Sequence, residues 1–181
     1  MPPPTTHQQS PLLHLARATA LLLSSSLTGA SITLSTLLVP RLLESPTPLM
    51  LQQMARTITH GQSAMPPLTA LAAAAYFYLA ASQFHVHDHG LRSGGAVRGY
   101  LLAGALCAGI APYTWFLMAP TSRRLLKKAE DVRGMSASEE VVEIGPREEG
   151  GKYLVDWWGV LNLGRAALFG LASGVGIFVS L

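Results

Sequence analysis

The sequence predicts an all-α integral membrane protein, a single domain of residues 1–181 built as a bundle of four transmembrane helices. Charged residues make up only 13% of the chain, against roughly 25% in an ordinary soluble domain. Four uncharged or nearly uncharged segments each supply the about 20 helical residues that cross a bilayer core. A soluble four-helix bundle would carry polar residues along one face of each helix, whereas these segments are apolar or small on every side.

The first two spans are expected at about 18–39 and 65–84. The first ends at Pro40 and Arg41. A cleaved signal peptide is the alternative for this segment, but the segment is longer than the about 7–15 apolar residues of such a peptide. The second is expected to begin at Met65-Pro66-Pro67, because proline favours the first turn of a helix.

The third and fourth spans are expected at about 99–119 and 157–181. Pro120 ends the third, and Arg165 is the single charge in the fourth. Between these two spans, the segment of about residues 122–156 carries similar numbers of acidic and basic side chains and several glycines. This composition predicts a flexible loop. Small residues four apart in both spans, such as Gly104 and Ala108, predict close helix packing or a homo-oligomer contact.

The basic residues outside the spans predict the orientation in the membrane. Three arginines flank the termini and the loop after the second span, against nine basic residues in the loops after the first and third spans. Basic loops favour the cytoplasm. We therefore expect those two loops to be cytoplasmic and both termini to be lumenal, in an internal membrane such as the endoplasmic reticulum.

Charge and cysteine content exclude several classes of protein. Thirteen basic against ten acidic residues give a net charge of only +3, too small an excess for the basic face of a nucleic-acid-binding protein. The single cysteine, Cys107, excludes an intramolecular disulfide and a Cys-rich metal site. The expected partners are the lipid bilayer and a small molecule.

Asn162 and Arg165 are the strongest candidate site residues. Their spacing of three places them on one face of a helix, with Trp158 and Phe169 on either side. An arginine inside a span costs several kcal/mol unless it is paired, reaches the interface or faces a polar cavity. Arg165 is therefore expected either to extend to the cytoplasmic interface or to bind an anionic oxygen, with Asn162 as a neutral hydrogen-bond partner.

Pro112 is expected to kink the third span one to two turns before its end. In one interpretation Tyr113 and Thr121 then face a wet pocket at the cytoplasmic end, with Trp115 and Trp158 as further substrate contacts. The alternative for the aromatic residues, Trp115 above all, is the belt of tryptophan and tyrosine found at membrane interfaces.

Histidines supply two further candidates. His60 ends an amphipathic stretch, Leu49 to His60, that could lie in the membrane interface. It is a candidate general base, because free imidazole has a pKa of about 6.5. The alternative is that His60 is a surface or capping residue. His85, His87 and His89 are spaced as metal ligands on a helix or an extended segment. A solvated lumenal turn is the favoured alternative, because the sequence offers no second cluster to complete a coordination shell.

Four segments together resemble a known family. They are Leu27-Thr28-Gly29-Ala30-Ser31, Gly61-Gln62-Ser63-Ala64-Met65-Pro66-Pro67, Ala111-Pro112-Tyr113-Thr114-Trp115-Phe116-Leu117-Met118-Ala119-Pro120-Thr121-Ser122, and Trp158-Gly159-Val160-Leu161-Asn162-Leu163-Gly164-Arg165. The chain resembles the small integral membrane proteins of the DUF1772 group, which includes the fungal anthrone oxygenases. The resemblance spans about residues 15–181, and Ser122 stands where the family usually has asparagine.

The resemblance implies a membrane-bound monooxygenase that converts an anthrone to an anthraquinone with molecular oxygen in aromatic polyketide secondary metabolism. No cofactor beyond oxygen is expected, and the substrate is a flat aromatic polyketide. Taken with the residues above, Arg165 and Asn162 are expected to stabilise an oxyanion, and His60 first or Tyr113 second to act as base. Spontaneous ionisation of the substrate is the alternative to both. The alternatives are a non-catalytic four-span scaffold and, less well supported by the residues, a small transporter.

Overall fold

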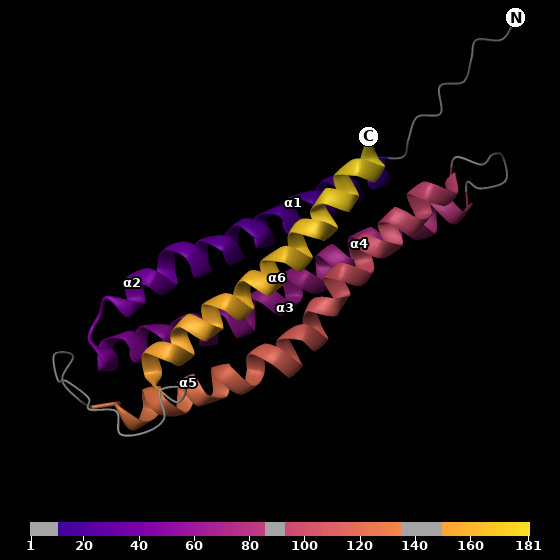
Figure 1. Ribbon diagram of the computed structural model, residues 1–181. Helices are drawn as coiled ribbons and strands as arrows, with labels where there is room; N and C mark the ends of the chain where they lie inside the picture. Colours follow the sequence, from indigo (N-terminus) through magenta and orange to yellow (C-terminus); the bar gives the residue numbers. More distant parts are fainter. Residues whose placement is uncertain (1–10, 86–92, 135–149) are drawn as a thin grey trace, which may run out of the picture.

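The computed structural model describes residues 11–85, 93–134 and 150–181, and these residues form helices and no strand. The all-helical fold is therefore confirmed. Figure 1 shows an elongated bundle in which the helices run alongside one another. The C-terminus and the first described turn of α1 lie at one end of it, and α2, α5 and the start of α6 lie at the other.

The helices form four continuous stretches, each of which contains a segment long and apolar enough to cross a membrane. Two of them include one turn of π-helix, labelled η. The elements are α1 (Pro11–Thr33), η1 (Leu34–Leu38), α2 (Val39–Leu43), α3 (Thr47–His85), α4 (Ser93–Tyr113), η3 (Thr114–Met118), α5 (Ala119–Asp131) and α6 (Gly151–Ser180).

The second span begins earlier than the sequence predicts. Helix α3 starts at Thr47 and runs for 39 residues, with Pro66 and Pro67 inside it rather than at its start. Both prolines are exposed, and the helix before them is held by buried apolar side chains such as Met54 and Ile58. The amphipathic stretch predicted for the interface therefore forms the first turns of α3, because tertiary packing outweighs the local cost of proline.

Residues 122–156 are also more regular than predicted. Helix α5 continues to Asp131, and α6 already begins at Gly151. Leu125 and Ala129, four residues apart, are buried on one face of α5, so this charged helix packs its apolar face against its neighbours. Residues 135–149 lie outside the described part of the chain.

Each π-helical turn lies shortly before a proline. Pro40 and Pro120 follow η1 and η3 by two residues. Proline supplies no backbone N–H, so the regular series of backbone hydrogen bonds is interrupted at a proline. Such an interruption is the usual cause of a bend in a helix. Pro112, at which the sequence predicts a kink, lies inside α4, and the π-helical turn η3 begins two residues after it; the helix then continues, and α4 and α5 follow one curved path in Figure 1.

The described residues form two apolar clusters in the interior. One lies among α1, α3, α4 and α6 and includes the fully buried Tyr76 and Phe169; the other lies among α2, α3, α5 and α6 and includes Leu125 and Trp158. Small residues bring the helices together, since a Cβ at Gly104 would overlap the ring of Phe77. A layer of polar side chains separates the two clusters along α1 and α6.

Candidate active site

The polar layer consists of five side chains that come from three of the four helical stretches: Ser31, Ser35, Tyr113, Asn162 and Arg165. Ser31 and Asn162 are fully buried, and Arg165 is only 8% exposed. Asn162 and Arg165 lie on the inner face of α6 between the buried Trp158 and Phe169, as their spacing predicts. The side chain of Arg165 is therefore directed into the bundle rather than along its outer surface.

Asn162 links α6 to the first helical stretch. Its Nδ2 donates to the backbone oxygen of Ser31 at 2.8 Å and to the Oγ of Ser35 at 3.0 Å. The hydroxyl of Ser35 in turn donates to the backbone oxygen of Gly159 at 2.9 Å. These bonds fix the relative positions of α1, η1 and α6.

The same hydrogen bonds limit what Asn162 can offer a ligand. Both amide hydrogens are used within the protein, so Asn162 has no donor left for an anionic oxygen. Its Oδ1 is buried and has no hydrogen-bond partner among the described residues. Asn162 therefore offers an acceptor, where the sequence analysis expected a donor.

Three buried polar atoms in this layer lack a partner in the described part of the chain: the Oγ of Ser31, the Oδ1 of Asn162 and the Nε of Arg165. No carboxylate of the described residues pairs with Arg165. A buried polar atom without a partner costs free energy, so such atoms in a native protein indicate a place for water or a ligand. One cation, one acceptor and one hydroxyl meet here inside a membrane bundle.

Tyr113 reaches the same layer from the end of α4. Its hydroxyl donates to the backbone oxygen of Leu161 at 2.7 Å. A Cβ at Gly164 would overlap this hydroxyl, so the glycine allows Tyr113 to approach the backbone of α6. Arg165 follows in the chain, and its charge interacts electrostatically with Tyr113. The structure thus brings Tyr113, Asn162 and Arg165 together.

The predicted substrate contacts separate into two groups. Trp158 is buried and its Nε1 donates to the Oγ of Ser122 at 3.2 Å, and Thr121 is buried beside Ser122 in the chain. Trp115 is 67% exposed, so it points outward from η3. This position fits the aromatic belt and does not fit the predicted substrate contact.

Among the predicted histidine candidates, His60 is described with its side chain, and this side chain does not join the polar layer. The side chain of His60 is exposed on α3, while Ile58 nearby is buried. His85 is the last residue of α3, but its side chain, like His87 and His89 as a whole, lies outside the described part of the chain. Among the described residues, no group of three or more His, Cys, Asp or Glu side chains has the arrangement of a metal site.

Two features in and beside this layer carried no functional prediction: the buried serines of the first helical stretch and Gly164. Ser24, Ser31 and Ser35 are all buried in the first helical stretch, and their spacing of seven and four places them on one face. That spacing is the signal that distinguishes them from the exposed hydroxyl residues of the same span. Gly164 has no such local signal, because its role depends on the approach of Tyr113 from α4.

Comparisons with known proteins identify the family. A family model described as anthrone oxygenase matches residues 54–175. A protein named anthrone oxygenase from Emericella nidulans is 39% identical over 109 residues, 59% of this chain and 53% of the relative. Relatives of the same name from Claviceps purpurea and Aspergillus novofumigatus are 32% and 31% identical, over 78% and 87% of this chain and 75% and 89% of their own lengths.

The chain thus spans about half the length of the Emericella nidulans relative and three quarters or more of the other two. No solved structure matches the chain. The family model covers more than half of the chain and includes most of α3, all of α4 and α5, and the part of α6 that carries Asn162 and Arg165. The resemblance inferred from the motifs is confirmed, and the chain belongs to the anthrone oxygenase family of enzymes.

Proposed function

We propose that this protein oxidises an anthrone to the corresponding anthraquinone with molecular oxygen, and that the reaction takes place at the polar layer. The observation that carries the proposal is the buried guanidinium of Arg165, whose Nε lacks a partner among the described residues. The names of the relatives support the class of reaction. A flat, apolar tricyclic substrate dissolves in the bilayer and can reach a site between helices.

The first step is the loss of a proton from the doubly benzylic CH₂ of the anthrone. The resulting negative charge spreads onto the carbonyl oxygen, to which Arg165 donates a hydrogen bond. Removing one such preorganised donor from an enzyme typically costs about 3–4 kcal/mol of transition-state stabilisation. A buried cation has this effect because the low-dielectric surroundings strengthen its interaction with the developing charge.

The anion then passes one electron to oxygen, and the two radicals combine at carbon to form a peroxide. Loss of water from this peroxide breaks the O–O bond and the remaining C–H bond and forms the second carbonyl group. One oxygen atom ends in the quinone and the other in water. The balance of atoms and electrons therefore requires no reductant, and we propose that oxygen is the only co-substrate and that no cofactor takes part.

Two further residues orient the substrate in this proposal. The free Oδ1 of Asn162 accepts a hydrogen bond from a hydroxyl group of the substrate. Tyr113 is a positioning residue, because its hydroxyl is bonded to the turn of α6 that carries Arg165. In this proposal the substrate ionises spontaneously and its first proton passes to solvent; His60, with its exposed side chain, has no part in this step.

We further propose that the protein lies in an internal membrane such as the endoplasmic reticulum. The loops after the first and third helical stretches then face the cytoplasm. Basic residues of α2, α5 and the start of α6 gather at one end of the bundle (Figure 1). Basic flanks favour the cytoplasmic side.

The test uses membranes that contain the protein, supplied with an anthrone and ¹⁸O₂ in the absence of any reductant. We expect quinone formation well above the rate in membranes without the protein, with one ¹⁸O atom in each quinone, and no loss of rate after chelator treatment. A rate equal to the background would overturn the proposal and favour the non-catalytic scaffold. A rate that a chelator abolishes and one metal restores would overturn the cofactor-free mechanism alone.

A further inference from the structure

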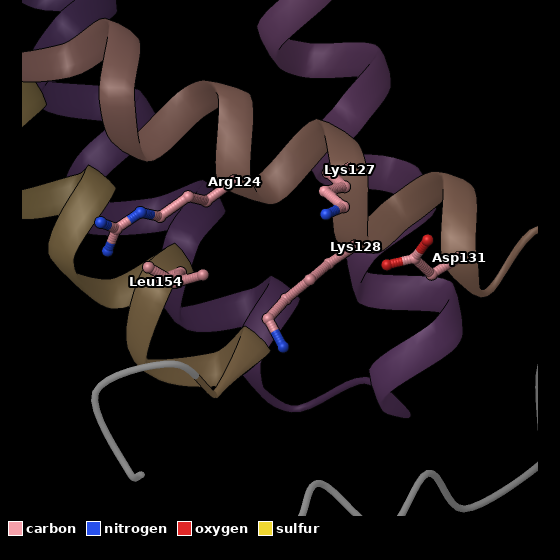
Figure 2. A pocket seen from close by; sticks show the side chains of 5 residues that line it. All are labelled: Arg124, Lys127, Lys128, Asp131 and Leu154. Carbon is pink, nitrogen blue, oxygen red and sulfur yellow. The ribbon is translucent and has the colours of Figure 1, made fainter. Parts of the chain in front are cut away.

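A basic pocket lies at the end of the bundle, away from the polar layer. Arg124, Lys127, Lys128 and Asp131 of α5 line it together with Leu154 of α6, and it is an open surface depression of about 340 Å³. Figure 2 shows Arg124 and Lys128 extending from α5 toward the first turns of α6. Small-molecule sites typically enclose about 300–1,000 Å³, so this depression has room for a charged headgroup.

The electrostatics of the pocket favour an anion. Three basic side chains line it against one carboxylate, that of Asp131. Arg124 and Lys127 form no ion pair with the described residues, whereas Arg41 and Arg133 at the same end of the bundle pair with Glu44 and Glu130 at 3.2 and 3.1 Å.

The start of α6 adds to this positive potential. Leu154 lies in the first turn of this 30-residue helix, which has no acidic residue in that turn and no side-chain cap at Gly150. The N-terminal end of a helix carries a partial positive charge. Basic side chains beside such an end form a common type of phosphate site.

The position of the pocket relative to the membrane indicates the source of the anion. Trp157, which is 44% exposed, lies three residues after Leu154, a rise of about 4.5 Å along the helix. Exposed tryptophans mark the interface between lipid and water. The pocket therefore lies just beyond this interface, at the depth of the lipid phosphates.

We propose that this pocket is a binding site for a phosphate group, presented by the headgroup of an anionic lipid. Basic pockets between helices at this depth suit such headgroups. The site differs from a general excess of basic residues on the cytoplasmic side, because it requires particular side chains around one depression. The proposal is independent of the reaction at the polar layer.

The experiment titrates the full-length protein in a neutral detergent with short-chain phosphatidic acid, with short-chain diacylglycerol as the uncharged, phosphate-free control and inorganic phosphate as the soluble control. Binding is measured by native mass spectrometry and by the shift in Tm. The test variant is Arg124→Gln with Lys127→Gln. The matched control, Arg41→Gln with Arg133→Gln, removes the same charge at the same end but outside the pocket.

We expect the pocket variant to weaken phosphatidic acid binding at least about tenfold, since charge-assisted hydrogen bonds are lost, and the control to change it less than about twofold. Asp131→Asn, which removes the opposing charge, is expected to tighten binding. Equal weakening by both double variants, or no binding at all, would overturn the proposal. Binding of inorganic phosphate as tight as that of phosphatidic acid, with the same sensitivity to the pocket variant, would support the phosphate site and assign it to a soluble ligand.

Discussion

The Nδ2 of Asn162 donates a hydrogen bond to the backbone oxygen of Ser31 at 2.8 Å, across 131 residues of sequence. Ser35 accepts the second hydrogen of the same amide. The amide therefore holds α6 against the first helical stretch. Only its oxygen remains without a hydrogen-bond partner among the described residues. This single side chain both stabilises the bundle and limits what the site can offer a ligand.

The first prediction concerns this amide. We expect Asn162→Leu to lower the free energy of unfolding by about 1–3 kcal/mol, because the donors of the link are lost and Ser35 loses a buried partner. Thermal unfolding in detergent measures the effect. Leu163→Ala, at a 41% exposed position on the next residue of α6, is the control and is expected to change Tm little. Equal Tm shifts in the two variants would contradict the linking role.

The second prediction concerns Arg165. We expect Arg165→Met to lower kcat/KM for anthrone oxidation by about 10²–10³, the usual effect of removing a donor to an oxyanion. The variant must remain in the membrane fraction with a cooperative unfolding transition. Arg56→Met, which removes an exposed arginine of α3, serves as control. Activity of Arg165→Met within about twofold of the unsubstituted protein would refute the oxyanion role.

The third prediction follows from the approach of Tyr113 to Gly164. A methyl group at Gly164 would overlap the Tyr113 hydroxyl, so Gly164→Ala should displace the tyrosine, destabilise the protein by about 1–3 kcal/mol and reduce kcat/KM. In the double variant with Tyr113→Phe, the overlapping oxygen is gone. We expect the double variant to be more stable than Gly164→Ala alone, and purely additive effects would show that the two residues are not in contact.

The fourth prediction compares two tryptophans of the expected substrate site. Trp158 is buried and bonded to Ser122, whereas Trp115 is 67% exposed. Trp158→Phe is therefore expected to lower the free energy of unfolding by about 1 kcal/mol through loss of the hydrogen bond and of buried area. Trp115→Phe is expected to leave both Tm and KM within error. A higher KM in Trp115→Phe alone would restore Trp115 as a substrate contact.

The fifth prediction concerns the base. Because the side chain of His60 is exposed on α3, we expect His60→Gln to retain kcat/KM within about twofold at every pH measured. The experiment is a pH profile of kcat/KM for both proteins in the same membranes. Loss of an ascending limb in the variant would show that His60 takes the proton, against the mechanism proposed here.

Local composition and spacing alone determined the number of spans and the alignment of Asn162 with Arg165. Hydropathy sums over adjacent residues, and residues three apart on a helix share a face whatever surrounds them. The motifs around Tyr113 and Arg165 likewise identified the family before any contact was known. These features depend on neighbours within a few turns, so no tertiary information was needed.

Only the tertiary structure decided where α3 begins, which tryptophan is buried and which atoms of Asn162 are free. Pro66 and Pro67 end a helix in isolation, but the buried face from Met50 to Ile58 packs against α5 and α6 and extends the helix across them. Trp115 and Trp158 differ in burial, although both lie in apolar segments. The hydrogens of Asn162 are committed to atoms of the first helical stretch, and no local pattern specifies the partner of a side chain when that partner comes from a distant helix.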